Sequence, residues 1–370
     1  MTLPRCLAAL FALILAGPPV LDAGTDPLAI AECAADWQLA HPSPKWKSTD
    51  WQNAAFYAGV MALADLSPSP RFREAMLLMG AANGWQLGPR VDHADDQAVG
   101  QTYADLFRHF GDARMIAAMR QRFDQILIHP PDDDLRFSRA TNPTFLDKWS
   151  WCDALFMAPP AWAKLTRVTG NPKYLRYAVR QWWVTSSYLY DPTEHLYFRD
   201  SSYFSLREKN GRKIFWSRGN GWVLAGLVRM LQAIPADDPE RTRFLTQFRE
   251  MAARIADLQG SDGFWRSSLL DPFSYPMQET SGTGFYCYGL AWGLETGILE
   301  RPKYYPAVKR AWRALVTCVK DDGRLTNVQP VGATPVTFDP DSTEPYGVGA
   351  LLLAATEVAR LSAGGAGHPH

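Results

Sequence analysis

The chain has 370 residues, of which 47% are hydrophobic, and its 38 basic and 38 acidic side chains leave a formal net charge of zero. A neutral chain has no bulk positive field, which excludes recognition of nucleic acids or anionic membranes by overall charge. The apolar fraction predicts a large core, and 14 Trp with 14 Tyr exceed what packing alone usually requires.

The N-terminus has the features of a secretory signal peptide over residues 1–23. Arg5 precedes a short apolar segment at 7–15, and small residues that suit a cleavage site follow. This segment is too short to span a bilayer and no later stretch is long enough, so no membrane anchor is expected. We therefore predict a periplasmic or secreted protein in which residues 24–370 form a single domain.

Six apolar helices rich in Gly or aromatic residues recur along the rest of the chain. They are expected over 51–67, 97–110, 152–169, 219–234, 281–298 and 342–361. Amphipathic helices separate them, the first near 26–40, and turns such as Gly170-Asn171-Pro172 end one helix and begin the next. Six such pairs predict an all-α (α/α)6 barrel whose parallel inner helices begin at one mouth. An open helical solenoid is the alternative.

A small β-hairpin is the main expected exception to this helical pattern. Asn210-Gly211 is a strong hairpin turn, and we expect 195–199 to pair with 212–216 across it.

The cysteines of the mature chain favour thiols over disulfides. Cys33, Cys152, Cys287 and Cys318 each lie in or beside an apolar helix, which predicts burial in spite of an oxidising compartment. The chain has no CxxC pair and no Cys-His motif, so we expect no metal and no organic cofactor.

The sharpest candidate for chemistry is Asp153, at the start of the most apolar inner helix. An Asp in this position commonly caps the helix. Trp149, Trp151 and Cys152 around it would instead desolvate the carboxyl and raise its pKa, as a proton donor at neutral pH requires. The helix dipole would lower that pKa, so the residues alone leave both roles open. Trp149 is also a candidate for a substrate contact.

A second acidic group, His93-Ala94-Asp95-Asp96, also stands at an inner-helix start. Helix caps in a solvated loop would explain it. Asp95 facing Asp153 across one mouth would, however, suit proton transfer with an activated water. His93 and Asp96 are the neighbouring candidates for substrate contacts.

The segment from Trp216 to Trp222 begins the fourth inner helix. Its glycines would bring backbone N–H groups close to a bound carboxylate, Arg218 would add a charged contact, and either tryptophan could stack on a sugar ring. An Arg paired with a neighbouring acid and tryptophans packed in the core are the structural alternative. Ser281, Thr283 and Arg199 are weaker candidates for substrate contacts, because caps and a solvated hairpin would also explain them.

In this order along the chain, these motifs resemble the unsaturated uronyl hydrolases. The motifs are His-Ala-Asp95-Asp-Gln, Trp-Cys-Asp153-Ala-Leu-Phe-Met-Ala-Pro-Pro, Phe-Trp-Ser-Arg218-Gly-Asn-Gly-Trp222 and Glu279-Thr-Ser-Gly. They are most similar to the unsaturated rhamnogalacturonyl hydrolases of glycoside hydrolase family 105, which are related to family 88. The resemblance runs over residues 45–362 and independently implies the (α/α)6 barrel.

The resemblance also implies the reaction, which acts on the unsaturated uronate that polysaccharide lyases leave. C4 of the C4=C5 vinyl ether is protonated, water adds at C5, and the resulting hemiketal opens to release the neighbouring sugar. The acid/base role then falls on Asp153, a second carboxyl on Asp95, and substrate contacts on Arg218 and Trp222. One departure is Arg199, where some members have His, which leaves the aglycone sugar open.

We therefore expect a monomeric glycoside hydrolase acting on unsaturated uronate oligosaccharides of the rhamnogalacturonan, or pectin, type. One alternative is an unsaturated glucuronyl hydrolase for another glycan. Others are an inverting glucanase, a sugar epimerase, or a non-catalytic oligosaccharide-binding protein on the same fold. A glucanase would require a long cleft and a Glu acid, and the two aspartates disfavour binding alone.

Overall fold

Helices alternate between two concentric layers in the computed structural model, which describes residues 26–364. The inner layer consists of α2 (Trp51–Ala64), α5 (Gly100–Phe110), α8 (Pro159–Thr169), α10 (Ser217–Ala233), α12 (Thr280–Glu295) and α14 (Pro345–Gly364). The outer layer consists of α1 (Pro27–Ala40), α3 (Arg71–Ala82), α6 (Arg114–Ile128), α9 (Lys173–Leu189), α11 (Arg241–Asp257) and α13 (Arg301–Thr317). The predicted (α/α)6 barrel is confirmed, while the predicted signal peptide at 1–23 lies outside the described residues.

The two layers differ in burial as their sequences predict. Every residue of α12 from Thr280 to Leu294 is buried, so this helix is surrounded by protein. On α11, in contrast, burial is confined to one stripe at helical spacing, and the charged residues face outward.

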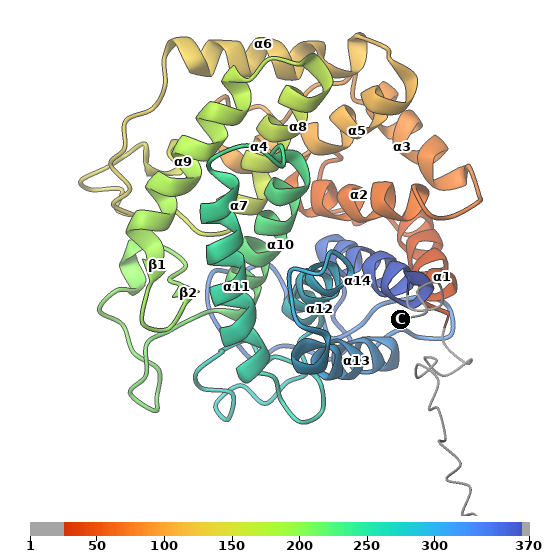
Figure 1. Cartoon of the computed structure of the whole chain (residues 1–370), viewed down its shortest axis with the longest axis vertical. Helices are drawn as coiled ribbons and strands as arrows, with labels where there is room; N and C mark the ends of the chain where they lie inside the picture. Colours follow the sequence, from red (N-terminus) through yellow and green to blue (C-terminus); the bar gives the residue numbers. More distant parts are fainter. Residues whose placement is uncertain (1–25, 365–370) are drawn as a thin grey trace, which may run out of the picture.

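The ring closes between the two ends of the described chain. α14 packs against α1 and α2 as well as against α12. In Figure 1 the blue C-terminal helix accordingly lies beside the red N-terminal helices. This closure excludes the open solenoid.

The inner helix expected at 152–169 is divided into α7 (Ala154–Met157) and α8. Pro159 and Pro160 begin α8 and cannot donate the backbone hydrogen bonds that would join the two segments. A further short helix, α4 (Ala94–Gln97), precedes α5, and two 3₁₀ turns lie at Phe145–Asp147 and Ser201–Tyr203. These short elements all lie next to the mouth residues described below.

The predicted hairpin is wrong in its pairing. The two strands are β1 (Tyr190–Asp191) and β2 (Leu196–Tyr197), which pair with each other. Asn210-Gly211 does form a turn, but only one bridge, between Arg207 and Lys213, flanks it. The expected partner strands are engaged elsewhere, because Trp216 bridges Ser268 and Asp200 bridges Trp151.

All four cysteines within residues 26–364 are free thiols, as predicted, but the predicted burial is correct for only three of them. Cys152, Cys287 and Cys318 are buried free thiols, whereas Cys33 is a free thiol on the exposed side of α1. Among residues 26–364, no helix is both long and apolar enough to cross a bilayer.

Candidate active site

Two aspartates and one arginine meet at the mouth formed by the N-terminal ends of the inner helices. Asp95 lies on α4, Asp153 directly precedes α7, and Arg199 follows β2. The negative charge of Asp153 contributes to raising the pKa of Asp95, and the positive charge of Arg199 lowers the pKa of both carboxyls. The three groups therefore act on one another electrostatically, as the predicted shared mouth requires.

Asp153 does not cap a helix. Its side chain accepts no capping hydrogen bond at α7, and the Cys152 thiol donates to its Oδ2 over 3.4 Å. Only 9% of the residue is exposed. Burial raises its pKa, and the charges of Arg199 and Arg218 oppose that shift. The capping alternative is therefore wrong, because the carboxyl makes no hydrogen bond to the N–H groups of α7.

Asp95 keeps a small opening to solvent, with 17% of its side chain exposed. Burial, opposed by the charge of Arg90 and reinforced by those of Asp153 and Asp96, raises its pKa to about 7. Two neighbouring carboxyls with raised pKa values titrate as a pair. A proton donor is then present near neutral pH.

His93 and Asp96 support Asp95 and do not face the mouth as free groups. His93 caps α4, since its Nδ1 accepts from the Asp95 N–H at 3.3 Å, and burial lowers its pKa to about 4. Both carboxylate oxygens of Asp96 accept from Arg90, at 2.6 and 3.1 Å. The prediction that these two side chains contact substrate is corrected to a positioning role.

Arg199 is held at the mouth by three interactions. Its Nη1 donates to Asp200 at 2.6 Å, and its guanidinium lies 4.8 Å from the ring centre of Phe137. Its carbonyl accepts from the Cys152 N–H at 2.8 Å, which ties it to the residue beside Asp153. With 17% of its side chain exposed, Arg199 is the cation best placed to meet an anionic substrate.

Asn220 is a positioning residue whose role was not predicted from the sequence. Its amide accepts from the Tyr197 N–H at 2.7 Å and donates to the Tyr197 carbonyl at 3.0 Å. It thereby fixes β2, and with it Arg199, against the start of α10. The motif Arg-Gly-Asn-Gly contains this residue, but only the distant strand that it binds explains its presence.

His195, near Arg199 in sequence, lies away from the site. Its Nδ1 is 3.0 Å from the Tyr190 hydroxyl and 3.6 Å from Glu250, and 39% of its side chain is exposed. Asp200, in contrast, follows the same segment and is only 1% exposed. The segment after β2 therefore folds over the mouth while the turn before it faces solvent.

Arg218 is completely buried, which corrects its predicted role in binding substrate. Its Nη1 and Nη2 donate to the carbonyls of Gln329 and Pro330, at 2.6 and 2.9 Å. Its guanidinium also lies over the rings of Trp216 and Tyr346. Arg218 thus anchors the segment between α13 and α14 to the mouth, and its positive charge lowers the pKa of Asp153.

Arg218→Met should lower the free energy of unfolding by about 2–4 kcal/mol, because the buried Gln329 carbonyl and the partly buried Pro330 carbonyl lose their donors. Urea denaturation measures this change. Arg176→Met, on the exposed face of α9, is the matched control and should stay within about 0.5 kcal/mol of the wild type. A loss of the same size in both variants would contradict the anchoring role.

The three candidate tryptophans are packed in the interior and offer no open stacking face. Trp222 is 0% exposed and lies 4.3 Å from the ring centre of Phe285. Trp216 is 2% exposed, with its Nε1 donating to Gln329 at 2.9 Å. Trp149 is 3% exposed. In this structure the three rings pack in the core and present no open face, so their contacts with a sugar ring stay a prediction.

Ser281 and Thr283 are also engaged within the protein. The Ser281 hydroxyl donates to Glu279 at 2.5 Å, where Glu279 caps α12 through the N–H groups of Ser281 and Gly282. The Thr283 hydroxyl accepts from the Trp265 N–H at 3.1 Å. Both side chains are 0% exposed, so the simpler explanation of cap and core is correct.

Gly219 allows the start of α10 to approach the catalytic candidate closely. A Cβ at this position would lie 3.1 Å from the Cys152 Sγ and 3.8 Å from the Asp153 Oδ2. The absence of a side chain at Gly219 therefore allows the start of α10 to pack closely against Cys152, the residue before Asp153. Among residues 26–364, no cluster of three or more His, Cys, Asp or Glu side chains suits a metal ion.

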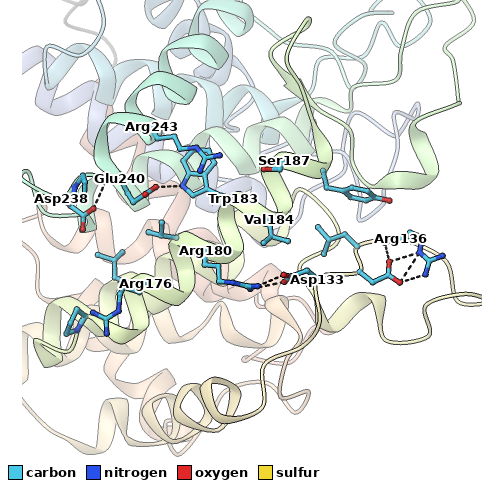
Figure 2. Close-up of a pocket in the computed structure, with 17 residues that line it drawn as sticks. Asp133, Arg136, Arg176, Arg180, Trp183, Val184, Ser187, Asp238, Glu240 and Arg243 are labelled. Carbon is cyan, nitrogen blue, oxygen red and sulfur yellow. Dashed lines mark hydrogen bonds and ion pairs between the residues drawn. The ribbon is translucent and has the colours of Figure 1, made fainter.

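A large groove of about 1090 Å³ lies elsewhere, on the outer wall between α9, α11 and residues 133–136 (Figure 2). Four of its eight charged lining residues form two ion pairs, Arg180 with Asp133 at 2.5 Å and Arg136 with Asp134 at 2.7 Å. Neither Asp95 nor Asp153 lines it. The groove is therefore separate from the candidate active site.

Comparison with known proteins agrees with this geometry. Residues 29–362 match the profile of Glycosyl Hydrolase Family 88. An unsaturated 3S-rhamnoglycuronyl hydrolase from Formosa agariphila is 40% identical over 337 residues, which cover 89% of each chain. A protein of the same name from Alteromonas sp. is 36% identical over 89% of this chain and 84% of its own.

A solved structure agrees as well. The glycosyl hydrolase family 88 protein from Bacteroides vulgatus has a TM-score of 0.83 and 32% identity, and the match covers 90% of this chain and 98% of that protein. The expected kinship with the unsaturated uronyl hydrolases is confirmed. The chain is a glycoside hydrolase and belongs to glycosyl hydrolase family 88.

Proposed function

We propose that the protein removes the unsaturated (4,5-dehydro) uronyl residue from the nonreducing end of lyase-generated, rhamnose-containing oligosaccharides. The observation that supports this best is the pair of buried carboxyls, Asp153 and Asp95, with raised pKa values beside Arg199. The names of the two relatives point to a uronyl group joined to rhamnose. A galacturonyl group of the pectin type and a glucuronyl group are the two forms to be compared.

In the proposed reaction, the Asp153 carboxyl delivers its proton to C4 of the vinyl ether. The positive charge that develops at C5 is shared with the ring oxygen, and water adds there. The proton that this water loses returns to the carboxylate pair, so the acid is regenerated. The C5–O bond of the hemiketal then breaks, giving a ketone at C5 and a hemiacetal at C1 that releases the neighbouring sugar.

Arg199 is proposed to bind the uronate carboxylate. The carboxylate is attached to C5, the carbon next to the one that is protonated, so a cation beside Asp153 is where it is needed. The positive charge of Arg199 lowers the pKa of Asp153, and 17% of the Arg199 side chain is exposed, whereas Arg218 is fully buried. A charged guanidinium-carboxylate contact would orient C4 toward the acid.

The test is loss of the ultraviolet absorbance of the conjugated uronate. Wild-type protein is offered unsaturated galacturonyl-rhamnose and unsaturated glucuronyl-rhamnose disaccharides, and the released sugar is measured in parallel. Turnover of either with equimolar sugar release supports the proposal, and the faster one identifies the uronate. Unchanged absorbance with every unsaturated disaccharide would reject it.

The pH dependence of kcat/KM should show an alkaline limb near the pKa of about 7 of Asp95. Asp153 and Asp95 titrate as a coupled pair, so the proton that Asp153 delivers is lost as the pH rises through that value, and activity falls above it. Asp95→Asn removes the negative charge beside Asp153, which lowers the pKa of Asp153 and moves the limb to lower pH. An unchanged pH profile in Asp95→Asn would show that the two carboxyls are not coupled.

We also propose that a monomeric mature protein acts in the periplasm or outside the cell. The signal-peptide features of residues 1–23 support export. Mass spectrometry of the protein recovered from the native host checks this, since a retained Met1 would contradict export by this route.

A further inference from the structure

A cavity of about 330 Å³ lies in the barrel at the opposite end of the inner helices from Asp153. All six inner helices line it, with Asp65 at the end of α2. Its charged lining residues are Arg108, Lys164, Arg167, Arg229, Arg360, Asp65, Asp105 and Glu357. Five cationic side chains thus face three carboxylates, which leaves an excess of positive charge.

Each carboxylate of the cavity already has a cation of its own. Lys164 pairs with Asp105, Arg108 with Asp65 at 2.9 Å, and Arg360 with Glu357 at 2.5 Å. Arg167 and Arg229 make no ion pair with a carboxylate among the described residues. The uncompensated charge therefore resides on these two guanidinium groups.

Arg229 is the deeper of the two and is rigidly held. Only 5% of it is exposed, and its Nε donates to Gln101 at 2.6 Å. Gln101 is itself fixed, because its amide donates to the Phe156 carbonyl at 2.8 Å. The buried Nη2 of Arg229 has no hydrogen-bond partner within residues 26–364. A buried donor without an acceptor is costly, and a bound ion or an ordered water would satisfy it.

The neighbourhood of this donor is cationic. The charges of Arg229 and Arg108 both lower the pKa of Lys164, after burial, which is the larger cause. Arg229 and Arg108 therefore both lie within electrostatic range of Lys164, with Asp105 as the carboxylate next to Lys164. We propose that this cavity binds a divalent tetrahedral oxyanion, sulfate or phosphate, between the buried Arg229 and the more exposed Arg167.

Such an anion would match both the charge and the donors. Its charge would offset the two unpaired guanidinium groups, and its oxygens would accept from the Nη2 of Arg229. The cavity is larger than one such ion, so ordered water would fill the rest. Because helices from the whole ring contribute to the lining, binding would join them at the end opposite the mouth and stabilise the fold.

The competing explanation is that the cations only offset the negative C-terminal ends of the inner helices, in which case no ligand is needed. The test compares thermal unfolding and calorimetric titration of the wild-type protein with inorganic sulfate, inorganic phosphate and chloride at equal ionic strength. We expect sulfate or phosphate to give a saturable rise in Tm of roughly 2–5 °C beyond the general salt effect. The oxyanion that binds more tightly is the preferred ligand.

Arg229→Gln should weaken oxyanion binding at least about tenfold. Arg176→Gln, on the exposed face of α9, is the matched control and should bind as the wild type does. Should Arg229→Gln fail to fold, Arg167→Gln replaces it, because that side chain is exposed. Wild-type crystals soaked in selenate should show an anomalous peak within hydrogen-bonding distance of the Arg229 Nη2. A chloride-like response, or no such peak, would overturn the proposal.

Discussion

Asp153→Asn should lower kcat by roughly 10³-fold while the KM for an unsaturated disaccharide stays within a few-fold of the wild-type value. The amide has the shape of the carboxyl but cannot deliver a proton to C4. Substrate binding should be retained, because Arg199 and the other residues around the mouth are unchanged. Loss of the uronate absorbance under initial-rate conditions measures kcat, and equilibrium dialysis with the inactive variant measures substrate binding.

The matched control for this variant is Asp133→Asn, an aspartate of the outer groove that pairs with Arg180 and does not line the mouth. It should retain wild-type kcat and KM. Asp153→Asn with wild-type kcat would remove the acid/base role from Asp153. The wild-type assay would still test whether the reaction takes place, and Asp95 would be the remaining candidate for the acid.

The fold could be predicted from the sequence because the pattern that specifies it is local. Helix-ending glycines such as Gly111 and Gly170 do adopt the left-handed conformation that the turns required. Alternation of apolar and amphipathic helices then determines which layer each helix occupies. The hairpin failed for the opposite reason, since the partner of Trp216 is Ser268, a residue that no local pattern connects to it.

The role of Asp153 depended on a balance that local sequence could not decide. The dipole of a long helix would have lowered its pKa, but the helix that follows it, α7, has only four residues before the prolines of α8. A helix this short has a weak dipole, so burial prevails and the pKa rises. The division of the helix at Pro159 thus contributes to the chemistry of the carboxyl.

Arg218 shows the limit of the same reasoning. Its sequence position at the start of an inner helix pointed to substrate, because an apolar core has little use for a guanidinium. The carbonyls that it binds belong to residues 111 and 112 positions further along the chain. Only tertiary structure brings them together, so a long-range loop anchor could not be distinguished from a binding residue.

Arg199 emerges instead as the cation on which substrate binding should depend. Arg199→Gln should lower kcat/KM by about 10²-fold, mainly through KM, because the uronate carboxylate loses its charged partner. The same change should move the alkaline limb of the pH profile upward. The charge of Arg199 lowers the pKa of both Asp95 and Asp153, so without it the carboxyls hold their protons to higher pH.

The pH shift separates this role from simple structural damage, which would lower activity without moving the limb. Arg199→Lys keeps the charge and should restore part of the KM and the wild-type pH profile, although it loses the paired donors of the guanidinium. Arg180→Gln is the matched control, since Arg180 also pairs with one neighbouring aspartate but lies on the outer groove. It should leave kcat, KM and the pH profile unchanged. A normal KM in Arg199→Gln would assign the uronate carboxylate to another cation of the mouth.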